Sequence, residues 1–427
     1  MNMFKTMAQA WRIPEIRKKL LYTVVMLVIF RLGSCIPVPG INRAIFAAAF
    51  QANDSGLFGL FDMFSGGAFS NFTIFALSIT PYITASIILQ LLTIAIPALE
   101  RLAQEGNEGR KKIAQYTRYL TVVLALVQAI GYTFGLFRNY LLSDSIAMKI
   151  VIILTLVAGT AFLMWLGERI NENGIGNGIS LIIFAGIVSR IPTGIRSTWN
   201  SLMDGTVSWI SIILFLIMAL FIIIGVIAVQ EGTRKIPVQY AKRVVGRKMY
   251  GGQSTHIPLK VNQSGVIPVI FSMSLLQMPL TIAYIWPNTG FANFVSKWMS
   301  PSGNPGVWVY CIFNVLLIIF FTYFYNGITF NPQEIAENMK ANGGFIPGIR
   351  PGRATVEYLA KIVNRLGIVG AIFLAIIATL PTLLQQWTAL QIGFGGTSLL
   401  IAIGVALETM KQLETQMVMR NYSGFLK

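Results

Sequence analysis

The sequence predicts an all-α polytopic membrane protein: ten transmembrane helices in two inverted five-helix halves, plus a short plug half-helix that does not cross. Two observations support this prediction of the fold class. Of the 427 residues, 55% are hydrophobic and only 11% are charged, whereas soluble globular proteins carry about 25% charged residues. Apolar runs of about 20 residues, the length that spans the hydrocarbon core, also recur along the chain. A disordered chain, a coiled coil and an ordinary cytosolic domain are therefore excluded.

The chain begins with a basic, amphipathic segment, residues 1–19, which is expected to lie in the cytoplasm. The apolar run behind it lacks the small-x-small pattern of a signal-peptide cleavage site. We therefore expect this run to remain as the first spanning helix.

Hydropathy over a window of about 19 residues predicts ten spans. The N-terminal half, 20–195, holds five of them, the C-terminal half, 207–412, holds the other five, and 413–427 is a cytoplasmic tail. The predicted spans are 20–36, 73–96, 116–137, 148–167, 178–195, 207–230, 263–286, 306–327, 363–386 and 396–412.

An additional apolar stretch at about 57–70 is too short to cross the membrane. It is interrupted by Asp62 and ends at Gly66 and Gly67. We expect a half-helix that enters the membrane and stops, with Asp62 facing water, where a charge costs little, and the glycine pair acting as a hinge.

Charge orients these spans. With the N-terminus inside, all but seven of the 33 Lys and Arg residues fall in inner segments, which is the positive-inside pattern of a multi-pass protein. Both termini are therefore predicted to be cytoplasmic, in the plasma membrane. The seven exceptions are Arg31, Arg43, Arg138, Lys149, Arg190, Arg196 and Lys297.

Two inner loops, 231–262 and 328–362, are longer than a helix connection needs. Their basic residues have two explanations that stay open: topology alone, or a docking surface for an acidic protein face or RNA phosphate. We favour docking, because short turns would suffice for topology.

The two halves share a faint pattern. After five crossings the chain is outside, so the second half runs inverted, as in many transport proteins whose path lies between the halves. Pro81 with Ile83 in the second predicted span corresponds to Pro268 with Ile270 in the seventh, and each pair is followed by Leu-Gln at the same offset.

No predicted span has a carboxylate near its middle, and the mid-span positions are instead rich in isoleucine. Ion-coupled transporters usually bury charged groups at this depth. An apolar ring can close a pore by dewetting without selecting an ion. The alternative is that these isoleucines simply pack or face lipid.

Enzymatic chemistry is not indicated. The sequence has two cysteines, Cys35 and Cys311, and one histidine, His256, so neither a metal centre nor a Ser–His–Asp arrangement is expected. The glycine-rich stretch 167–180 has no preceding strand and no following Gly-Lys-Ser/Thr, so we expect an inner turn and no nucleotide site. No cofactor is expected.

Several motifs together resemble the SecY family of channel subunits of the bacterial protein translocon, in a Gram-positive-like form, along nearly the whole chain. The motifs are IPVPGIN (36–42), MFSGGAFSNFTIFALSITPYITASIILQLL (63–92), EGNEGRKKIAQYTRY (105–119), FLMWLGERINENGIGNGISLIIFAGIV (162–188), QYAKRVVGRK (239–248), QSTHIPLKVNQSGVIP (253–268), FNPQEIAENMKANGGFIPGIRPG (330–352) and FGGTSLLIAIGVALETMKQ (394–412).

The resemblance implies four sets of site residues. It assigns a pore ring, a plug that closes the outer funnel, a lateral gate between the second and seventh spans with a polar inner latch, and basic docking positions. The pore ring consists of Ile79, Ile83, Ile179, Ile183, Ile270 and Ile401, and the plug includes Phe61, Phe64, Ser65, Gly66 and Gly67. The latch of the lateral gate consists of Gln90 and Asn262, and the docking positions are Arg247, Lys248 and Arg350.

The function implied is a passive protein-conducting channel. It passes unfolded secretory polypeptides and releases hydrophobic segments sideways into membrane lipids. The implied partners are the membrane subunits SecE and SecG, with the SecA ATPase or the ribosome supplying the drive. Two rivals are a secondary transporter for a small solute, which would need charged or sodium-coordinating groups at mid-depth, and a non-conducting scaffold or insertase, which would not need the half-helix.

Overall fold

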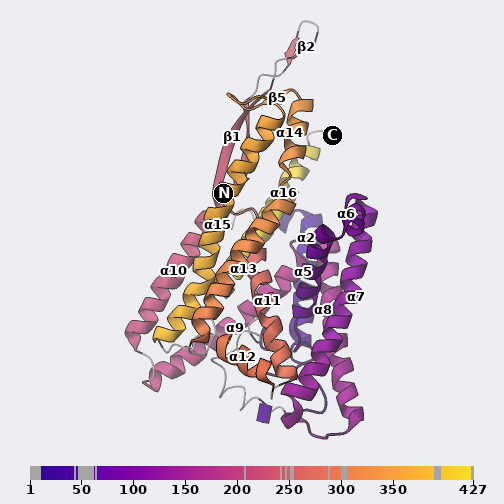
Figure 1. Ribbon diagram of the computed structural model, residues 1–427, viewed down its shortest axis with the longest axis vertical. Coiled ribbons are helices and arrows are strands. Elements are labelled where there is room, and N and C mark those ends of the chain that lie inside the picture. Colours follow the sequence, from indigo (N-terminus) through magenta and orange to yellow (C-terminus); the bar gives the residue numbers. More distant parts are fainter. Residues whose placement is uncertain are drawn as a thin grey trace.

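The computed structural model describes residues 11–42, 45–46, 62, 65–205, 208–240, 243–245, 248–250, 254–286, 289–299, 305–388 and 396–424. Figure 1 shows a long bundle in which the N-terminal helices form one side and the C-terminal helices form the other. The segments expected inside gather at one end of the bundle, together with the small β-sheet. The segments expected outside gather at the opposite end, around α12 (Gly290–Trp298).

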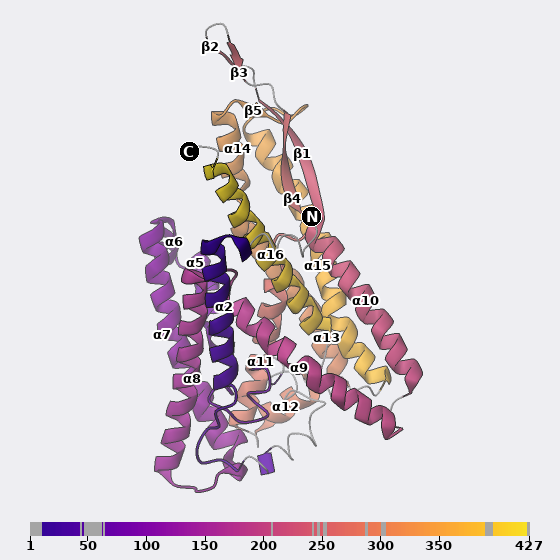
Figure 2. The ribbon, with the colours of Figure 1, turned by 180° about the vertical axis from the view of Figure 1, so that it is seen from behind.

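The N-terminal side contains helices that run alternately between the two ends of the bundle (Figure 2). They are α2 (Pro14–Gly33), α5 (Thr80–Ala95), α6 (Pro97–Gln104), α7 (Asn107–Gly131), α8 (Ile146–Asn173) and α9 (Gly178–Met203). A π-helical turn, η1 (Tyr132–Leu136), and a 3-10 turn, η2 (Arg138–Tyr140), follow α7.

The C-terminal side follows the same alternation. Its long helices are α10 (Trp209–Glu231), α11 (Ile267–Ile285), α13 (Gly306–Thr329), α15 (Arg353–Thr388) and α16 (Gly396–Gly424). The short helix α12 connects α11 to α13, and α14 (Pro332–Ala341) lies beside the sheet.

Every predicted span coincides with part of a helix, but the predicted number of crossings is not established. Six described helices are long and apolar enough to cross a membrane, and α5 with α6 forms a seventh candidate that bends by 101° at Ile96. The apolar part of α11 is shorter. The bend follows from Pro97, which cannot donate the backbone hydrogen bond that would continue α5.

The second predicted span is wrong at its start. The sequence pattern placed it at 73, whereas α5 begins at Thr80. Residues 66–79 instead form successive turns, in which Phe72 (φ 45°) and Ser78 (φ 54°) adopt left-handed backbone conformations. Pro81 then sits in the first turn of the helix, where its missing N–H costs nothing. The apolar run therefore continues through a segment that is not helical.

The two long loops that the charge pattern predicts to be inside fold together into a sheet that the hydropathy pattern does not predict. Strand β1 (Thr233–Tyr240) pairs antiparallel with β4 (Ser254–Lys260) and, at its end, with β5 (Gly344–Phe345). Ile236, Val238 and Leu259 form a core with residues of α14 and α15. A separate hairpin, β2 (Arg243–Val245) and β3 (Lys248–Tyr250), lies at the far tip (Figure 1).

A turn is confirmed within the predicted glycine-rich stretch 167–180, at residues 174–177 between α8 and α9. Gly176 has φ +92°, and the Asn177 side chain accepts hydrogen bonds from the backbone N–H groups of Ile179 and Ser180, which starts α9. A Cβ on Gly178 would lie 2.1 Å from the carbonyl oxygen of Gly167. The glycines thus allow α8 and α9 to pack closely at this turn.

Candidate functional site

Two short helices with the same opening pattern meet between the halves. α5 and α11 each begin with a proline in the first turn, Pro81 and Pro268, and each has an isoleucine two residues later. The fixed φ of proline suits the first helical turn, so the helix can begin there inside the bundle. The shared pattern therefore places Ile83 and Ile270 in the first turns of two helices that contact one another.

The six isoleucines of the predicted ring belong to one apolar cluster at the meeting point of the halves. Five of them are buried: Ile79, Ile83, Ile183, Ile270 and Ile401. Ile179 is partly buried against the same cluster. They come from α5 or the residue just before it, from α9, from α11 and from α16.

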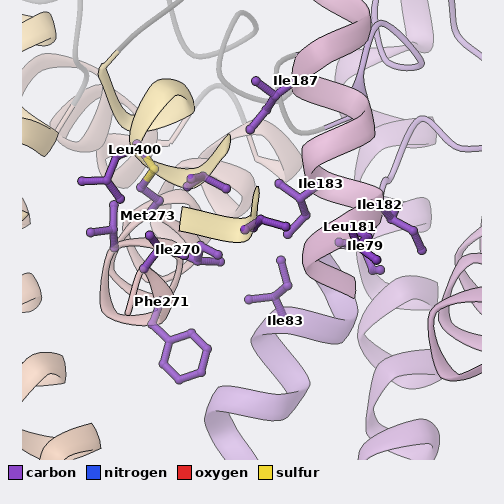
Figure 3. Packing of buried hydrophobic residues seen from close by; sticks show 14 of the residues in the cluster. Ile79, Ile83, Leu181, Ile182, Ile183, Ile187, Ile270, Phe271, Met273 and Leu400 are labelled. Atoms are coloured by element: carbon purple, nitrogen blue, oxygen red, sulfur yellow. The ribbon is translucent and has the colours of Figure 1, made fainter. Parts of the chain in front are cut away.

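The isoleucines do not all face the same way. Figure 3 shows Ile83 and Ile183 turned toward the side on which Ile270 lies, whereas Ile79 lies near Leu181 and Ile182. The Ile179 side chain lies against α8, because a Cβ on Gly167 would be 3.0 Å from its Cγ1. Ile83 and Ile183 therefore face Ile270, whereas Ile79 and Ile179 face other neighbours.

α16 supports this cluster from the C-terminal half. Ile401 is fully buried in its second turn. A Cβ on Gly404 would lie 2.5 Å from Cγ1 of Val266, the residue that precedes α11. Close approach at a glycine is how spanning helices pack tightly in the absence of a hydrophobic driving force between them.

A tight turn lies against α9 next to this cluster. We call Asp62 with Ser65–Thr73 the Gly66–Gly67 turn. Both glycines have positive φ, +64° and +90°, a conformation that L side chains rarely adopt. A Cβ on Gly66 would lie 2.6 Å from the Cα of Gly186 in α9. Only glycine at position 66 allows the turn to approach the helix this closely.

Charged groups hold the Gly66–Gly67 turn in this position. The Arg190 guanidinium of α9 forms an ion pair with the Asp62 carboxylate. Arg31 of α2 donates a hydrogen bond to the Gly66 carbonyl oxygen at 2.8 Å, and the Ser189 hydroxyl lies 3.4 Å from the same oxygen. Two separate helices, α2 and α9, therefore meet at this turn.

Asp62 also organises the turn internally. Its Oδ1 accepts hydrogen bonds from the Ser70 backbone N–H at 2.7 Å and from the Ser65 hydroxyl at 3.4 Å. Its backbone carbonyl accepts from the Gly67 N–H at 3.1 Å. A carboxylate that accepts several hydrogen bonds and an ion pair can be buried without a prohibitive desolvation cost.

The expectation that Asp62 faces water is therefore wrong. Its exposed fraction is 0%. The physical reason is that Arg190 compensates the charge within the protein, so solvent is not needed for it. Ser65, Gly66 and Gly67 lie in the turn as described, whereas Phe61 and Phe64 lie outside the described residues.

The two residues predicted as a polar latch each bond within their own segment. The Gln90 amide donates to the Ser86 hydroxyl at 3.3 Å, and its buried Oε1 has no hydrogen-bond partner among the described residues. The Asn262 amide donates to the Gly265 carbonyl at 2.9 Å and its Oδ1 accepts from Ser264. The helices α5 and α11 are in contact, but no hydrogen bond joins these two side chains in the described part of the chain.

The predicted docking positions lie at the sheet end of the bundle. Arg350 is exposed in a turn between β5 and α15, and this turn is shaped by Gly348 and Gly352, both with positive φ. Lys248 belongs to β3, whereas Arg247 lies outside the described residues. The Thr355 hydroxyl donates to the Arg350 backbone carbonyl at 3.0 Å, so the turn is fixed while the guanidinium projects from it.

The sequence reading missed Arg31, Ser189 and Arg190 as site residues. A signal was available for the two arginines, because both are among the seven basic residues that fall on the outer side in the charge-based topology. A basic residue that works against the topology rule needs another reason to be there. Here the reason is the Gly66–Gly67 turn.

The arrangement gathers apolar side chains where the two halves meet. Within the described ranges, no group of three or more His, Cys, Asp or Glu side chains could hold a metal ion. The site is an apolar meeting point of four helices, with a charge-held turn packed beside it. Such a point can separate two aqueous spaces, because water does not wet a narrow apolar constriction.

Known proteins match this chain over most of its length. A family model described as SecY matches residues 73–410. The protein translocase subunit SecY of Halalkalibacterium halodurans is 48% identical over all of both chains, and that of Bacillus subtilis is 47% identical with the same coverage. The Thermotoga maritima protein of that name is 45% identical, covering this chain fully and 98% of its own length.

Solved structures show the same fold at lower identity. One reported as "The structure of a protein conducting channel" has a TM-score of 0.67 at 22% identity and covers 94% of this chain and 93% of its own. Sec61 in the canine ribosome–channel complex has a TM-score of 0.60 at 20% identity, with 94% and 93% covered. These likenesses concern the fold.

Proposed function

The chain belongs to the SecY family of protein translocase subunits, and from that membership we propose that it is a passive channel for unfolded secretory polypeptides. The observation that carries the proposal is the burial, in one cluster, of isoleucines from α5, α9, α11 and α16. A translocated chain has an arbitrary sequence, so its path cannot specify hydrogen bonds. Branched apolar side chains can yield to any passing segment and exclude ions when they close again.

The Gly66–Gly67 turn is the described part of the proposed plug. It packs on α9 beside the cluster, and Arg31, Ser189 and Arg190 hold it there. Ala68, Phe69 and Phe72 of the same turn are buried in the apolar clusters, so the turn must give up this packing as well as the polar contacts in order to leave the cluster. The proposed plug therefore has a defined resting place and a defined set of bonds to break.

The contact between α5 and α11 is the proposed lateral gate. Its function would be sorting by partition: a Leu, Ile, Phe or Val at mid-depth favours lipid by about 0.3–0.6 kcal/mol, and an Asp, Lys or Arg opposes it by about 2.5–3.5 kcal/mol. A sufficiently apolar segment leaves sideways and other segments pass through. Gln90 and Asn262 keep their proposed role as polar groups at the inner part of this gate.

Direction must come from a partner, since a channel of this kind only equilibrates. The exposed Arg350 turn and the basic strands beside it support docking of the SecA motor or the ribosome there. SecE and SecG are the proposed membrane subunits. The proposed location is the plasma membrane, with both termini in the cytoplasm, because the basic residues concentrate at that end.

The proposal is tested by crosslinking a stalled secretory chain to single cysteines at the six isoleucine positions in proteoliposomes. Crosslinks at Ile83, Ile183 and Ile270 are expected, together with none at Ile282, an exposed α11 position. Equal crosslinking at Ile282, or none at the three interior positions, would show that the polypeptide does not pass through this cluster.

A further inference from the structure

A short helix at the end of the bundle opposite the sheet presents aromatic side chains that the described residues cover only in part. α12 packs back onto α11 through Ala292 and Val295, which are buried. Val295 forms a small apolar cluster with Leu280 of α11, and Met299 packs against it. α12 is therefore attached to the half of α11 that lies farther from Pro268.

The remaining surface of α12 is divided into two faces. Phe291, Phe294 and Trp298 recur at helical spacing and are exposed, with Phe294 at 57%. Asn293, Ser296 and Lys297 occupy the side opposite the apolar ones. The helix is thus amphipathic, with an apolar arc that α11 covers only in part.

The uncovered aromatic face continues a surface that is already apolar. Ile282 on α11 and Trp286, which directly follows that helix, are exposed. On α13, which α12 also contacts, Trp308 and Ile312 are exposed. α13 is one of the helices long and apolar enough to cross a membrane. In Figures 1 and 2, α12 lies across the end of the bundle rather than along it.

We propose that α12 lies flat in the membrane–water interface and inserts Phe291, Phe294 and Trp298 among the lipid chains. Aromatic side chains are enriched at this depth, and interfacial helices bury their apolar face there while the polar face stays wet. Lys297 is placed to meet lipid phosphate. Its Nζ lies 5.9 Å from the centroid of the Trp298 ring, so the charge sits at the edge of the aromatic face.

Contact of α12 with lipid also explains why a lysine is found at position 297. Lys297 is one of the basic residues on the outer side in the charge-based topology. A lysine beside an aromatic face can extend its chain along the apolar surface while the ammonium reaches the headgroups. A single positive charge therefore fits a phosphate-bearing surface next to the aromatic groups.

The consequence for the channel rests on the proposed function of α11 as a gate helix. Because Val295 and Leu280 pack together, α11 cannot tilt away from α5 without moving α12 through the interface. Lipid contact would therefore hold that end of α11 in place. The lipid contact itself does not depend on translocation, so the two claims can fail separately.

The test places a fluorophore on each face of α12 in the full chain. Cys35→Ser and Cys311→Ser remove the native thiols, and Phe294→Cys or, as the matched control on the polar face, Ser296→Cys is labelled with NBD. The chain is reconstituted in vesicles of phosphatidylcholine and phosphatidylglycerol, alone and with its co-purifying membrane subunits. Quenching is measured with nitroxide lipid, labelled high on the acyl chain, and with aqueous iodide.

Label at 294 is expected to lose most of its emission to nitroxide lipid and little to iodide, with the reverse at 296, in both preparations. Equal iodide quenching at both positions would overturn the proposal, since neither face would then be in lipid. Loss of lipid quenching at 294 on adding the subunits would also overturn it, because a protein would then cover the face.

Discussion

Arg190 of α9 and Asp62 of the Gly66–Gly67 turn form an ion pair that fastens the turn to the helix carrying Ile183. Asp62 is fully buried, whereas the Arg190 side chain is 29% exposed. The two residues lie far apart in the sequence. Their pairing means that the proposed plug is held by charge as well as by packing.

Removal of Arg190 is expected to raise the resting ion leak. Arg190→Gln leaves the Asp62 carboxylate buried without its counter-charge, and breaking a buried pair in this way costs about 3–5 kcal/mol. The partial exposure of Arg190 places the expected cost near the lower end of that range. Conductance of reconstituted protein in planar bilayers, without substrate, measures the effect.

Asp62→Asn serves as the matched variant, because it removes the charge instead of stranding it. Its leak is expected to be smaller than that of Arg190→Gln, and the double variant should leak less than Arg190→Gln alone. Equal conductance in wild type and Arg190→Gln would show that the ion pair does not hold the turn.

Gly66→Ala tests the close approach of the turn to α9. The new Cβ would lie 2.6 Å from the Cα of Gly186, and the backbone at φ +64° is strained for any L side chain by about 1–2 kcal/mol. Gly67→Ala is the control, since it has the same kind of backbone strain but its new Cβ would lie 3.8 Å from the nearest side-chain atoms, those of Asn71 and Arg190. Single-channel recordings should find the resting channel open more often in Gly66→Ala than in Gly67→Ala; similar open times would mean that the contact with Gly186 is unimportant.

The sequence identified the spans well and the turn poorly, for a physical reason. Apolar runs long enough to cross lipid are a local property, so the helices from α7 to α10 could be located from composition alone. The run at 73–79 is equally apolar but forms turns, and hydropathy does not distinguish a buried turn from a helix. What fixes it is contact with distant segments.

The ion pair and the sheet were missed for related reasons. Nothing local to Asp62 indicates Arg190, since only folding brings α9 to the turn. Strands β1 and β4 did carry a local signal, because Ile236 and Val238, like Ile257 and Leu259, lie two residues apart, which is the period of a half-buried strand. The residue between each pair, however, is a proline, which argues against a strand. The basic residues around them favoured an interpretation as loops.

The basic residues predicted on the outer side also have partners that the sequence alone does not reveal. Lys149 pairs with Asp144, and the hydrogen bond from Lys149 is the main cause that lowers the pKa of this carboxyl. Arg31 and Arg190 hold the turn, and Lys297 lies at the edge of α12. The topology rule identified these residues as exceptions but contained no information about their partners.

Widening of the apolar cluster is expected to raise the leak as well. Ile83→Gly with Ile270→Gly removes branched side chains that are both buried in the cluster, and each loss leaves space that water can enter. The control is Ile282→Gly, an exposed position on α11 that has a similar loss of helix propensity of about 1 kcal/mol. Ion flux from loaded proteoliposomes should rise for the double variant and stay at the wild-type rate for Ile282→Gly. An unchanged flux in both variants would show that Ile83 and Ile270 only pack the protein interior and do not seal the channel.

Reversal of the Arg350 charge is expected to abolish motor-driven translocation while the protein stays folded. Arg350 is exposed in its turn, and the contact that fixes the turn uses its backbone carbonyl rather than its guanidinium. Arg350→Glu therefore removes a docking charge without removing a described packing contact.

Arg353→Glu, three residues away and also exposed, is the control and should retain most activity. ATP-dependent uptake of a secretory precursor into proteoliposomes measures both, with the thermal unfolding midpoint as the check on folding. Wild-type uptake by Arg350→Glu would exclude this turn from docking, and equal loss in both variants would attribute the effect to net charge at that end of the bundle.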